Sequence, residues 1–344
     1  MIDALLSAWA VAALLFTAVL LYRLTRRTAP GAAHFEHPEV LLLRPVDAPT
    51  AAELENLADV PPGVRQIVIS PYRPALPRHI EWLPWDPIAP NRKASHLAAA
   101  LMRYGPQKVV LTADADVRVT RELVEALLEK ARGGAQLCTA PPSIEATGWG
   151  GLALSGILDH GPHSLTALDQ MSIGPRAVCG KACALGPAAQ ELLPRLTRVV
   201  GEDLELSVRL HAAGHRVELA SAPARVIPGV LPLRATVDRM TRWQQVLRAH
   251  RPALFPTVPL LIAPTLPLLA ASVLAEAPFA LALSAALVLA RIAVSFALKR
   301  DRHASWSWAL GEAVLLTGFA RALVRRTVVW RGQRHRLAHG GTMQ

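Results

Sequence analysis

The feature that most constrains the fold of this chain is an apolar run near its start, ALLSAWAVAALLFTAVLLY at residues 4–22. At about 1.5 Å per residue, a helix of this length crosses a bilayer core of about 30 Å. The alternative is a cleaved signal peptide. However, no basic residue precedes the run, and no small-residue cleavage site with a polar stretch follows it. The run therefore predicts an N-terminal transmembrane anchor over residues 1–27.

Basic residues and two further apolar runs set the expected topology. RLTRR at 23–27 follows the anchor directly, so the positive-inside rule places the middle of the chain in the cytoplasm. Apolar sequence returns at 253–275 and 279–298, separated by the short EAP turn, and KRDRH then follows. These runs predict two transmembrane helices over 252–300. The chain is thus expected to be an integral protein of a bacterial inner (cell) membrane, with its central domain cytoplasmic.

A last apolar run, at 305–324, differs from the others because it contains two charged residues, Glu312 and Arg321. If it crossed the bilayer, the basic tail that follows would lie outside, against the charge rule. We therefore expect an interfacial or re-entrant helix and a basic C-terminal tail over 301–344.

The composition narrows the class of partner. The chain carries a net charge of +11 and is 52% hydrophobic, with 5% aromatic residues. Excess positive charge is typical of proteins that bind nucleic acid or an anionic membrane face. Because basic and aromatic residues are not interleaved as in RNA-binding modules, the composition favours a membrane and argues against nucleic acid.

Between the apolar segments, residues 28–251 alternate short β-rich runs with helical ones. The β-rich runs are EVLLLRPV, VRQIVIS and KVVLTAD, at 39–46, 64–70 and 108–114. Thr50 and Thr120 are placed as N-caps of the helical segments that follow them, and the segment KASHLAAALMRYG ends at a glycine. This alternation predicts an α/β domain with a mostly parallel sheet.

Two carboxylates, Asp114 and Asp116, come directly after the third β-rich run. Ligands of α/β sheets bind beyond the carboxyl ends of the strands, which is where this pair falls. Acids in a turn are also commonly structural. Position alone therefore leaves a metal site, catalytic acids and turn residues open.

Two later segments carry further candidate residues. Glu202 and Asp203 open an amphipathic helix, where N-terminal capping is the simple explanation. Arg239, Arg242 and Trp243 share one face of a second helix because they are spaced three and four apart. Such a face suits a membrane surface, and it equally suits a pyrophosphate with a sugar stacked on the indole.

Taken in order, these motifs resemble the family-2-type inverting glycosyltransferases, and most closely their ceramide glucosyltransferase branch, which includes hopanoid-associated enzymes. NRKASHL at 91–97 is similar to the N-x-K-x-x-x-L segment of that family, GEDLELSVRL to its ED motif, and RMTRW to its (Q/R)xxRW motif. The tail at 328–342 is similar to its terminal W-R-x-G-R-Y-R-L stretch. The resemblance implies a GT-A-like (Rossmann-like) nucleotide-sugar domain with N- and C-terminal transmembrane helices.

The resemblance also implies a donor site. Asp116 would bind Mn²⁺ or Mg²⁺ together with the diphosphate of the donor, because hard cations take oxygen ligands. Asp114 would contact the ribose or the donor sugar, and Lys93 would lie near the nucleotide. Arg239 and Arg242 would hold the pyrophosphate.

For the transfer itself, the resemblance implies that Asp203 is the general base for the acceptor hydroxyl. Trp243 would line the sugar or acceptor pocket, and Glu202, His160 and His163 are candidate acceptor-side residues. The implied reaction moves a sugar, expected to be a hexose on UDP, to a lipid hydroxyl such as that of ceramide, in glycolipid biosynthesis and sphingolipid metabolism. A hopanoid or other lipid N-acetylhexosaminyl transferase and an inactive membrane scaffold are the alternatives.

One departure from the family pattern concerns the nucleotide. The family has an aspartate at the end of the second strand, where this chain has Ser70. Asp47, after the first strand, is close in topology but does not match the motif. The identity of the nucleotide is therefore left open.

Overall fold

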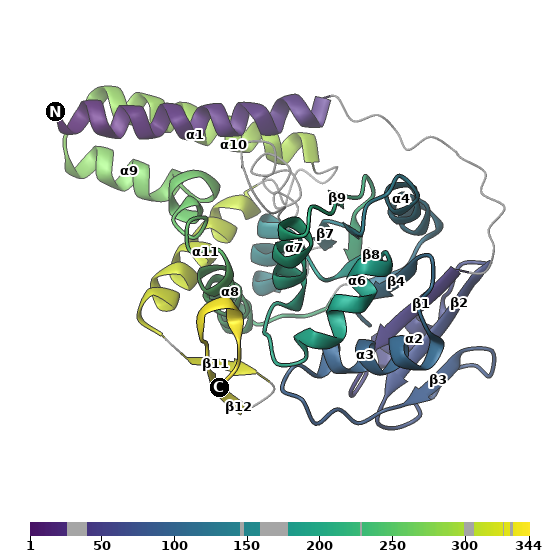
Figure 1. Ribbon diagram of the computed structural model, residues 1–344. Helices are drawn as coiled ribbons and strands as arrows, with labels where there is room; N and C mark the ends of the chain where they lie inside the picture. The colour runs from purple at the N-terminus through teal and green to yellow at the C-terminus, as the bar shows by residue number, and fades with distance from the viewer. Residues whose placement is uncertain are drawn as a thin grey trace.

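A computed structural model describes residues 1–25, 40–144, 148–158, 178–227, 229–298, 306–325, 327–330 and 333–344. In this part of the chain, an α/β domain lies beside a group of apolar helices that includes the first helix, α1 (Ile2–Thr25) (Figure 1). The predicted combination of an α/β domain with N- and C-terminal apolar helices is confirmed.

The central sheet has seven strands in the order β3-β2-β1-β4-β8-β6-β9. Their bounds are β1 (Val40–Pro45), β2 (Val64–Ser70), β3 (Glu81–Pro84), β4 (Val110–Ala113), β6 (Leu137–Thr139), β8 (Ala182–Leu185) and β9 (Val217–Leu219). Among these strands, the pairings of β8 with β4 and β6 are antiparallel and the other four are parallel. The predicted mostly parallel sheet is therefore confirmed.

The helices that cover the sheet begin at residues with local reasons to begin a helix. They are α2 (Ala51–Ala58), α3 (Arg92–Tyr104), α4 (Arg121–Arg132), α6 (Pro187–Leu192) and α7 (Glu202–Ala212). Thr50 forms a reciprocal capping box with Glu53, and the hydroxyl of Thr120 caps α4. The carboxamide of Asn91 caps α3.

The core has two layers because successive strand residues point to opposite faces. On β1, Leu41 and Leu43 pack in the cluster that contains residues of α3, α6 and α7. Val40 and Leu42 pack in the cluster that contains residues of α4. The carboxyl ends of β1 and β4 are thereby held in the middle of the sheet, between two packed layers.

A small sheet and a long helix continue the domain towards the apolar helices. The sheet has the order β5-β10-β7, with bounds Val117–Arg118, Ala224–Val226 and Pro142–Ile144. It is followed in the chain by α8 (Leu233–His250), which carries Arg239, Arg242 and Trp243.

Three described helices are long and apolar enough to cross a membrane: Ile2–Tyr22, Pro278–Ala297 and Ser307–Val324. The first two belong to α1 and α10 (Pro278–Leu298), which pack side by side (Figure 1). Ala10, Ala13 and Leu287 lie in the contact between these helices.

The apolar run at 253–275, expected to form one transmembrane helix, is broken in the structure. It contains a π-helix, η2 (Val258–Ile262), and the ten-residue helix α9 (Thr265–Leu274). Pro259, Pro264 and Pro267 account for the interruption because proline lacks a backbone N–H and clashes with the preceding turn. At 1.5 Å per residue, α9 covers only about 15 Å, half of a bilayer core.

The last helix, α11 (Ser307–Val324), packs along α8. A Cβ atom on Gly318 would lie 3.1 Å from the backbone of Met240 and Thr241, so the two helices approach closely where α11 lacks a side chain. The hairpin of β11 (Thr327–Trp330) and β12 (Gln333–Arg336) follows and leads to the C-terminus. The division into domains, and whether α11 crosses the bilayer or lies at its surface, stay predictions.

Candidate active site

The turn that carries Asp114 and Asp116 is held from beneath by buried polar side chains. Arg44 on β1 donates to the carbonyl oxygens of Asp114 and Val117, both at 3.0 Å. Asn56 donates to the carbonyl of Val117 at 2.8 Å. Burial lowers the pKa of Arg44 to about 10, and the charges of Asp114 and Asp116 oppose this shift. Because the backbone of the turn is tied down in this way, the two carboxylates are held at the sheet edge.

Two lysines bind these carboxylates. Lys93 on α3 lies 2.7 Å from Oδ1 of Asp114, and Lys181 lies 3.0 Å from Oδ2 of the same residue. The Nζ of Lys181 is also 2.7 Å from both carboxylate oxygens of Asp116. Burial would raise the pKa of Asp114, but the two ammonium groups outweigh it and lower that pKa to about 2. Asp114 is therefore ionised, and each of the two acids is paired with a lysine.

Asp203 lies at the start of α7, across Gly180 from Lys93. Its Oδ2 accepts a hydrogen bond of 2.5 Å from the backbone N–H of Gly180, and its Oδ1 accepts one of 2.9 Å from Leu204. Burial and the neighbouring charge of Glu202 raise the pKa of Asp203 to about 6, against the opposing charge of Lys93. A carboxylate with a pKa near neutrality is suited to accept a proton.

Glu202, the neighbour of Asp203, is bonded within the protein. Its Oε2 accepts a hydrogen bond of 2.8 Å from Asn91, the N-cap of α3, and its Oε1 lies 3.6 Å from Lys93. Glu202 thus connects the start of α7 to the start of α3. Its predicted acceptor-side role stays a prediction.

The start of α7 is also clasped by the C-terminal tail. The N–H of Val200 donates to the carbonyl of Gly341 at 2.9 Å, and His250 of α8 contacts the carbonyl of Val200 at 2.6 Å. Gly341 has a φ of +71°, and a Cβ atom there would lie 2.0 Å from His250, so only glycine fits. The tail segment that resembles the family pattern therefore supports the loop before Asp203.

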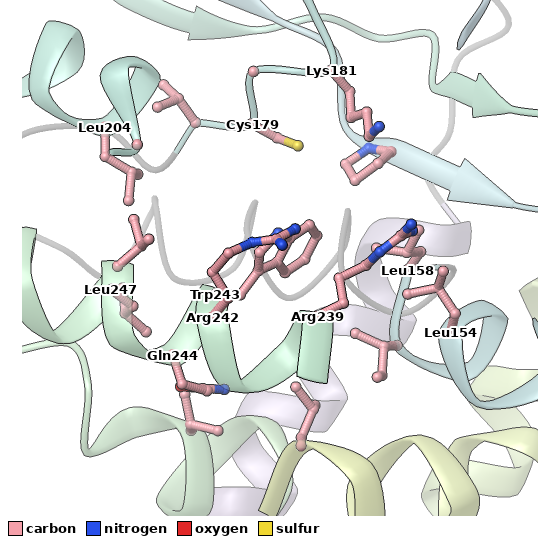
Figure 2. A pocket seen from close by; sticks show the side chains of 18 of the residues that line it. Leu154, Leu158, Cys179, Lys181, Leu204, Arg239, Arg242, Trp243, Gln244 and Leu247 are labelled. Atoms are coloured by element: carbon pink, nitrogen blue, oxygen red, sulfur yellow. The ribbon is translucent and has the colours of Figure 1, made fainter. Parts of the chain in front are cut away.

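Arg239, Arg242 and Trp243 extend from α8 into a cavity, as their spacing predicts. Figure 2 shows them on the side facing Cys179 and Lys181. Burial lowers the pKa of Arg242, and the like charge of Arg239 lowers it further. Two guanidiniums that repel each other in a partly buried place would be stabilised by a bound anion.

The cavity, about 440 Å³ in volume, brings the motifs together. One end is lined by charged residues that come from the sheet edge and from the starts of α3 and α7: Lys93, Asp114, Lys181, Glu202 and Asp203. The rest of the lining, called the apolar end below, consists mainly of apolar residues of the helical part: Leu154, Leu158, Leu247, Leu254, Val258, Ile262 and Leu315. Asp116 does not line the cavity itself and adjoins it through Lys181.

Two buried charges form part of the apolar end. Glu312 of α11 accepts hydrogen bonds from the N–H and the hydroxyl of Thr265, at 3.1 and 2.8 Å, and so caps α9. Arg291 of α10 donates to the carbonyls of Leu261 and Ile262, at 3.0 and 3.1 Å. These bonds supply partners for backbone groups at the break between η2 and α9, which would otherwise be unsatisfied in an apolar environment.

The structure thus brings seven predicted site residues to one cavity: Lys93, Asp114, Glu202, Asp203, Arg239, Arg242 and Trp243. His160 and His163 lie outside the described residues. Lys181 and Arg44 were not predicted. Lys181 lies in the segment GKACALG at 180–186, which matches none of the motifs described above. Arg44 lies in the apolar strand β1, and the sequence of a strand does not indicate that a charged side chain in it contacts a turn of another strand.

Ser70 is not among the residues that line the cavity. It is buried, and its hydroxyl donates to the carbonyl of Tyr72 at 2.7 Å and accepts from the indole of Trp82 at 3.0 Å. Asp47 is held by Arg92 and His96, each at 2.9 Å. The hydroxyl of Ser70 is therefore committed to the protein and does not replace the missing aspartate.

The acids at the sheet edge fit a divalent metal in part. The described residues contain no group of three or more Asp, Glu, His or Cys side chains able to surround an ion. Asp114 and Asp116 supply carboxylate oxygens, the ligands that Mn²⁺ and Mg²⁺ prefer. Magnesium is commonly bound by one or two carboxylates together with substrate phosphates, so this donor set is sufficient when a diphosphate completes it.

An α/β sheet edge with paired acids, facing a helix with two arginines and a tryptophan, defines the class of the protein as a glycosyltransferase. The chain belongs to glycosyl transferase family 21, whose family model matches residues 83–343. The predicted resemblance to the ceramide glucosyltransferase branch is thereby confirmed. No curated protein matches the chain significantly.

Among solved structures, the chain is similar to the mannosyltransferase PcManGT from Pyrobaculum calidifontis, in complex with GDP-Man and Mn²⁺. The two chains are 17% identical, the TM-score is 0.49, and the match covers 94% of this chain and 99% of that one.

Proposed function

We propose that this protein is a membrane-bound inverting glycosyltransferase that moves a sugar from a nucleotide-sugar donor to the hydroxyl of a lipid such as ceramide. One observation carries the proposal. A single cavity joins the carboxylates and lysines of the sheet edge to apolar residues of α8, η2 and α11 and of the segments beside them. A water-soluble donor suits the first end and a lipid acceptor the second.

In this proposal the donor binds at the charged end. Arg239 and Arg242 hold its diphosphate, since their mutual repulsion is relieved by an anion. Asp116 holds Mn²⁺ or Mg²⁺ and Asp114 the ribose or sugar, with Lys93 beside them. The metal supplies charge neutralisation for the leaving diphosphate.

Transfer then requires one displacement at the anomeric carbon. The carboxylate of Asp203 takes the proton from the acceptor hydroxyl as its oxygen attacks, and the bond to the diphosphate breaks on the opposite side. The hydrogen bonds from Gly180 and Leu204 fix the orientation of this carboxylate. Trp243 lines the pocket between donor and acceptor.

The proposed organisation comprises a transmembrane anchor at 1–27, a cytoplasmic glycosyltransferase domain at 28–251 and two apolar membrane segments at 252–300, of which the first is broken at its prolines. An interfacial or re-entrant helix and a basic tail follow at 301–344. Three helices long and apolar enough to cross a membrane support the membrane location. The clustering of Arg at 23–27, after the first apolar segment, supports the cytoplasmic orientation.

The test is transfer by the full-length protein, purified in detergent, with Mn²⁺ or Mg²⁺. UDP-glucose, UDP-N-acetylglucosamine and GDP-mannose would each be combined with ceramide, diacylglycerol and a hopanoid alcohol. We expect a glycolipid with inverted anomeric configuration, identified by mass spectrometry and NMR. Transfer to a hopanoid from the N-acetylglucosamine donor would favour the alternative acceptor. Absence of donor turnover and of donor binding would support an inactive scaffold.

A further inference from the structure

The position between the two acids of the sheet edge is taken by the ammonium group of Lys181. Its Nζ is 2.7 Å from both oxygens of Asp116 and 3.0 Å from Oδ2 of Asp114. Three carboxylate oxygens thus converge on one positive charge. Two of them, the oxygens of Asp116, are the ones that the metal of the proposed function would use.

Lys93 is a natural comparison because it also lies half-buried beside Asp114. It binds Oδ1 of Asp114 at 2.7 Å, donates to the carbonyl of Gly180 at 2.5 Å and lies 3.6 Å from Glu202. Its ion pairs join Asp114 to Glu202 at the start of α7, and none of those described reaches Asp116. The two lysines therefore have different places: Lys93 connects two parts of the site, and Lys181 neutralises the acid pair.

A metal ion and the ammonium of Lys181 cannot share these oxygens. Each needs the lone pairs that face the gap, and like charges at such distances repel strongly in a partly buried site. A metal that binds alone would displace the ammonium of Lys181, so the favourable contacts of the metal would be offset by the loss of the ion pairs of Lys181. A diphosphate changes the balance because it brings further oxygen ligands and negative charge to the metal and to the displaced ammonium.

We propose that Lys181 is an exchangeable internal cation of the donor site. In the donor-free enzyme it holds Asp114 and Asp116, and it releases them when a divalent metal enters together with a nucleoside diphosphate. The long, flexible side chain of lysine allows this movement and leaves the ammonium available to a phosphate oxygen. The metal therefore binds weakly alone and tightly with the diphosphate. This inference rests on the proposed function, because it requires a metal at Asp116.

The test measures Mn²⁺ binding without any transfer reaction. The full-length protein in detergent is titrated with Mn²⁺, and the loss of the free-ion signal is followed by electron paramagnetic resonance. In Lys181→Met, which removes the charge but keeps an unbranched side chain, we expect Mn²⁺ alone to bind about tenfold tighter than in the unmodified protein. In Lys93→Met we expect a smaller gain, because Lys93 does not contact Asp116.

A second measurement uses UDP or GDP as the diphosphate. In the unmodified protein either nucleotide should tighten Mn²⁺ binding, and by linkage Mn²⁺ should tighten nucleotide binding by the same factor. This coupling should shrink by about tenfold in Lys181→Met, since the metal no longer has a cation to displace. Lys181→Arg, which keeps the positive charge, should bind Mn²⁺ alone as weakly as the unmodified protein. This variant also serves if Lys181→Met does not fold.

The outcomes separate the two levels of the proposal. If Asp116→Asn leaves Mn²⁺ binding intact, the metal site of the proposed function is wrong. If Asp116→Asn abolishes Mn²⁺ binding while Lys181→Met leaves it unchanged or weaker in a protein with an unaltered melting temperature, only the role of Lys181 is overturned. Lys130→Met, on the surface of α4, is the control for removal of a lysine elsewhere.

Discussion

Within the charged part of the cavity, the sheet edge and helix α8 present different arrangements of charge. At the sheet edge, Lys93 lies within 2.7 Å of Asp114, and Lys181 within 2.7 Å of Asp116, so anions and cations are already paired. On α8, the pKa of Arg242 is lowered by burial and by the charge of Arg239. The sheet edge therefore presents ion pairs, whereas α8 presents two guanidiniums of like charge, which a bound anion would stabilise.

The apolar end contains two charged residues that are bonded to the protein backbone. Its buried charges, Arg291 and Glu312, are bonded to the backbone of η2 and α9, so they complete the helices. The residues around them are predominantly apolar. A charged substrate gains little there, whereas a lipid chain loses no hydrogen bonds on entering. The predictions below test this division of the cavity into charged and apolar ends.

The largest effect is expected from Asp203→Asn, which removes the proposed base. The amide keeps the size of the side chain but cannot accept the proton, so kcat should fall by about a thousandfold. Donor binding, measured by calorimetry, should change little. Asp238→Asn is the control because that carboxylate lies in an exposed ion pair with Arg321. Near-normal turnover of Asp203→Asn would show that another group takes the proton.

The next largest effect is expected from Arg242→Ala on the α8 face. Loss of a guanidinium that stabilises the diphosphate should lower kcat/KM for the donor by about a hundredfold. Arg248→Ala is the matched control, since Arg248 lies on the same helix but donates to the carbonyl of Ala322. If both variants lose the same activity, the effect is one of helix packing and the anion site is wrongly assigned.

Local patterns were enough to predict three of the seven strands of the central sheet and the three motifs. β1, β2 and β4 follow from short β-rich runs, and the shared face of Arg239, Arg242 and Trp243 follows from helical spacing. Each of these features depends on residues that are close together in the sequence, so it can be found without knowledge of the fold.

Contacts between distant segments could not be predicted in this way. Lys181 contacts Asp116 because β8 pairs antiparallel with β4. The two strands are far apart in the sequence, so no local pattern predicts this pairing. The tail reaches the start of α7 through Gly341 and Val200, which are far apart in sequence. The apolar run at 253–275 likewise suggested one helix, whereas its prolines interrupt that helix in the structure.

A moderate effect is expected from pH. The pKa of Asp203 is raised to about 6, mainly by burial, and the base must be ionised to act. Transfer should therefore be nearly full above pH 7 and fall by about tenfold towards pH 5, as the carboxylate becomes protonated. The measurement is kcat/KM across this range, with Mn²⁺ and donor binding measured in parallel. A rate that stays level down to pH 5 would contradict the assignment of Asp203 as the base.

The smallest effect is expected from Leu247→Ala at the apolar end. Leu247 lines the cavity one helical turn beyond Trp243, on the side away from the sheet edge. Removal of part of an apolar wall should raise the KM for the lipid acceptor by about fivefold, because less apolar surface is buried on binding. Donor binding, and any slow hydrolysis of the donor by water, should not change.

This last variant decides whether the two ends act separately. Leu323→Ala, an exposed leucine of α11, controls for a general change in the response to detergent or bilayer. If Leu247→Ala weakens donor and acceptor binding equally, the cavity is one continuous donor site and the lipid must enter elsewhere. If Leu247→Ala changes only the KM for the acceptor, and Arg242→Ala changes only kcat/KM for the donor, the two substrates occupy separate parts of the cavity. The change from charged to apolar lining then marks the boundary between them.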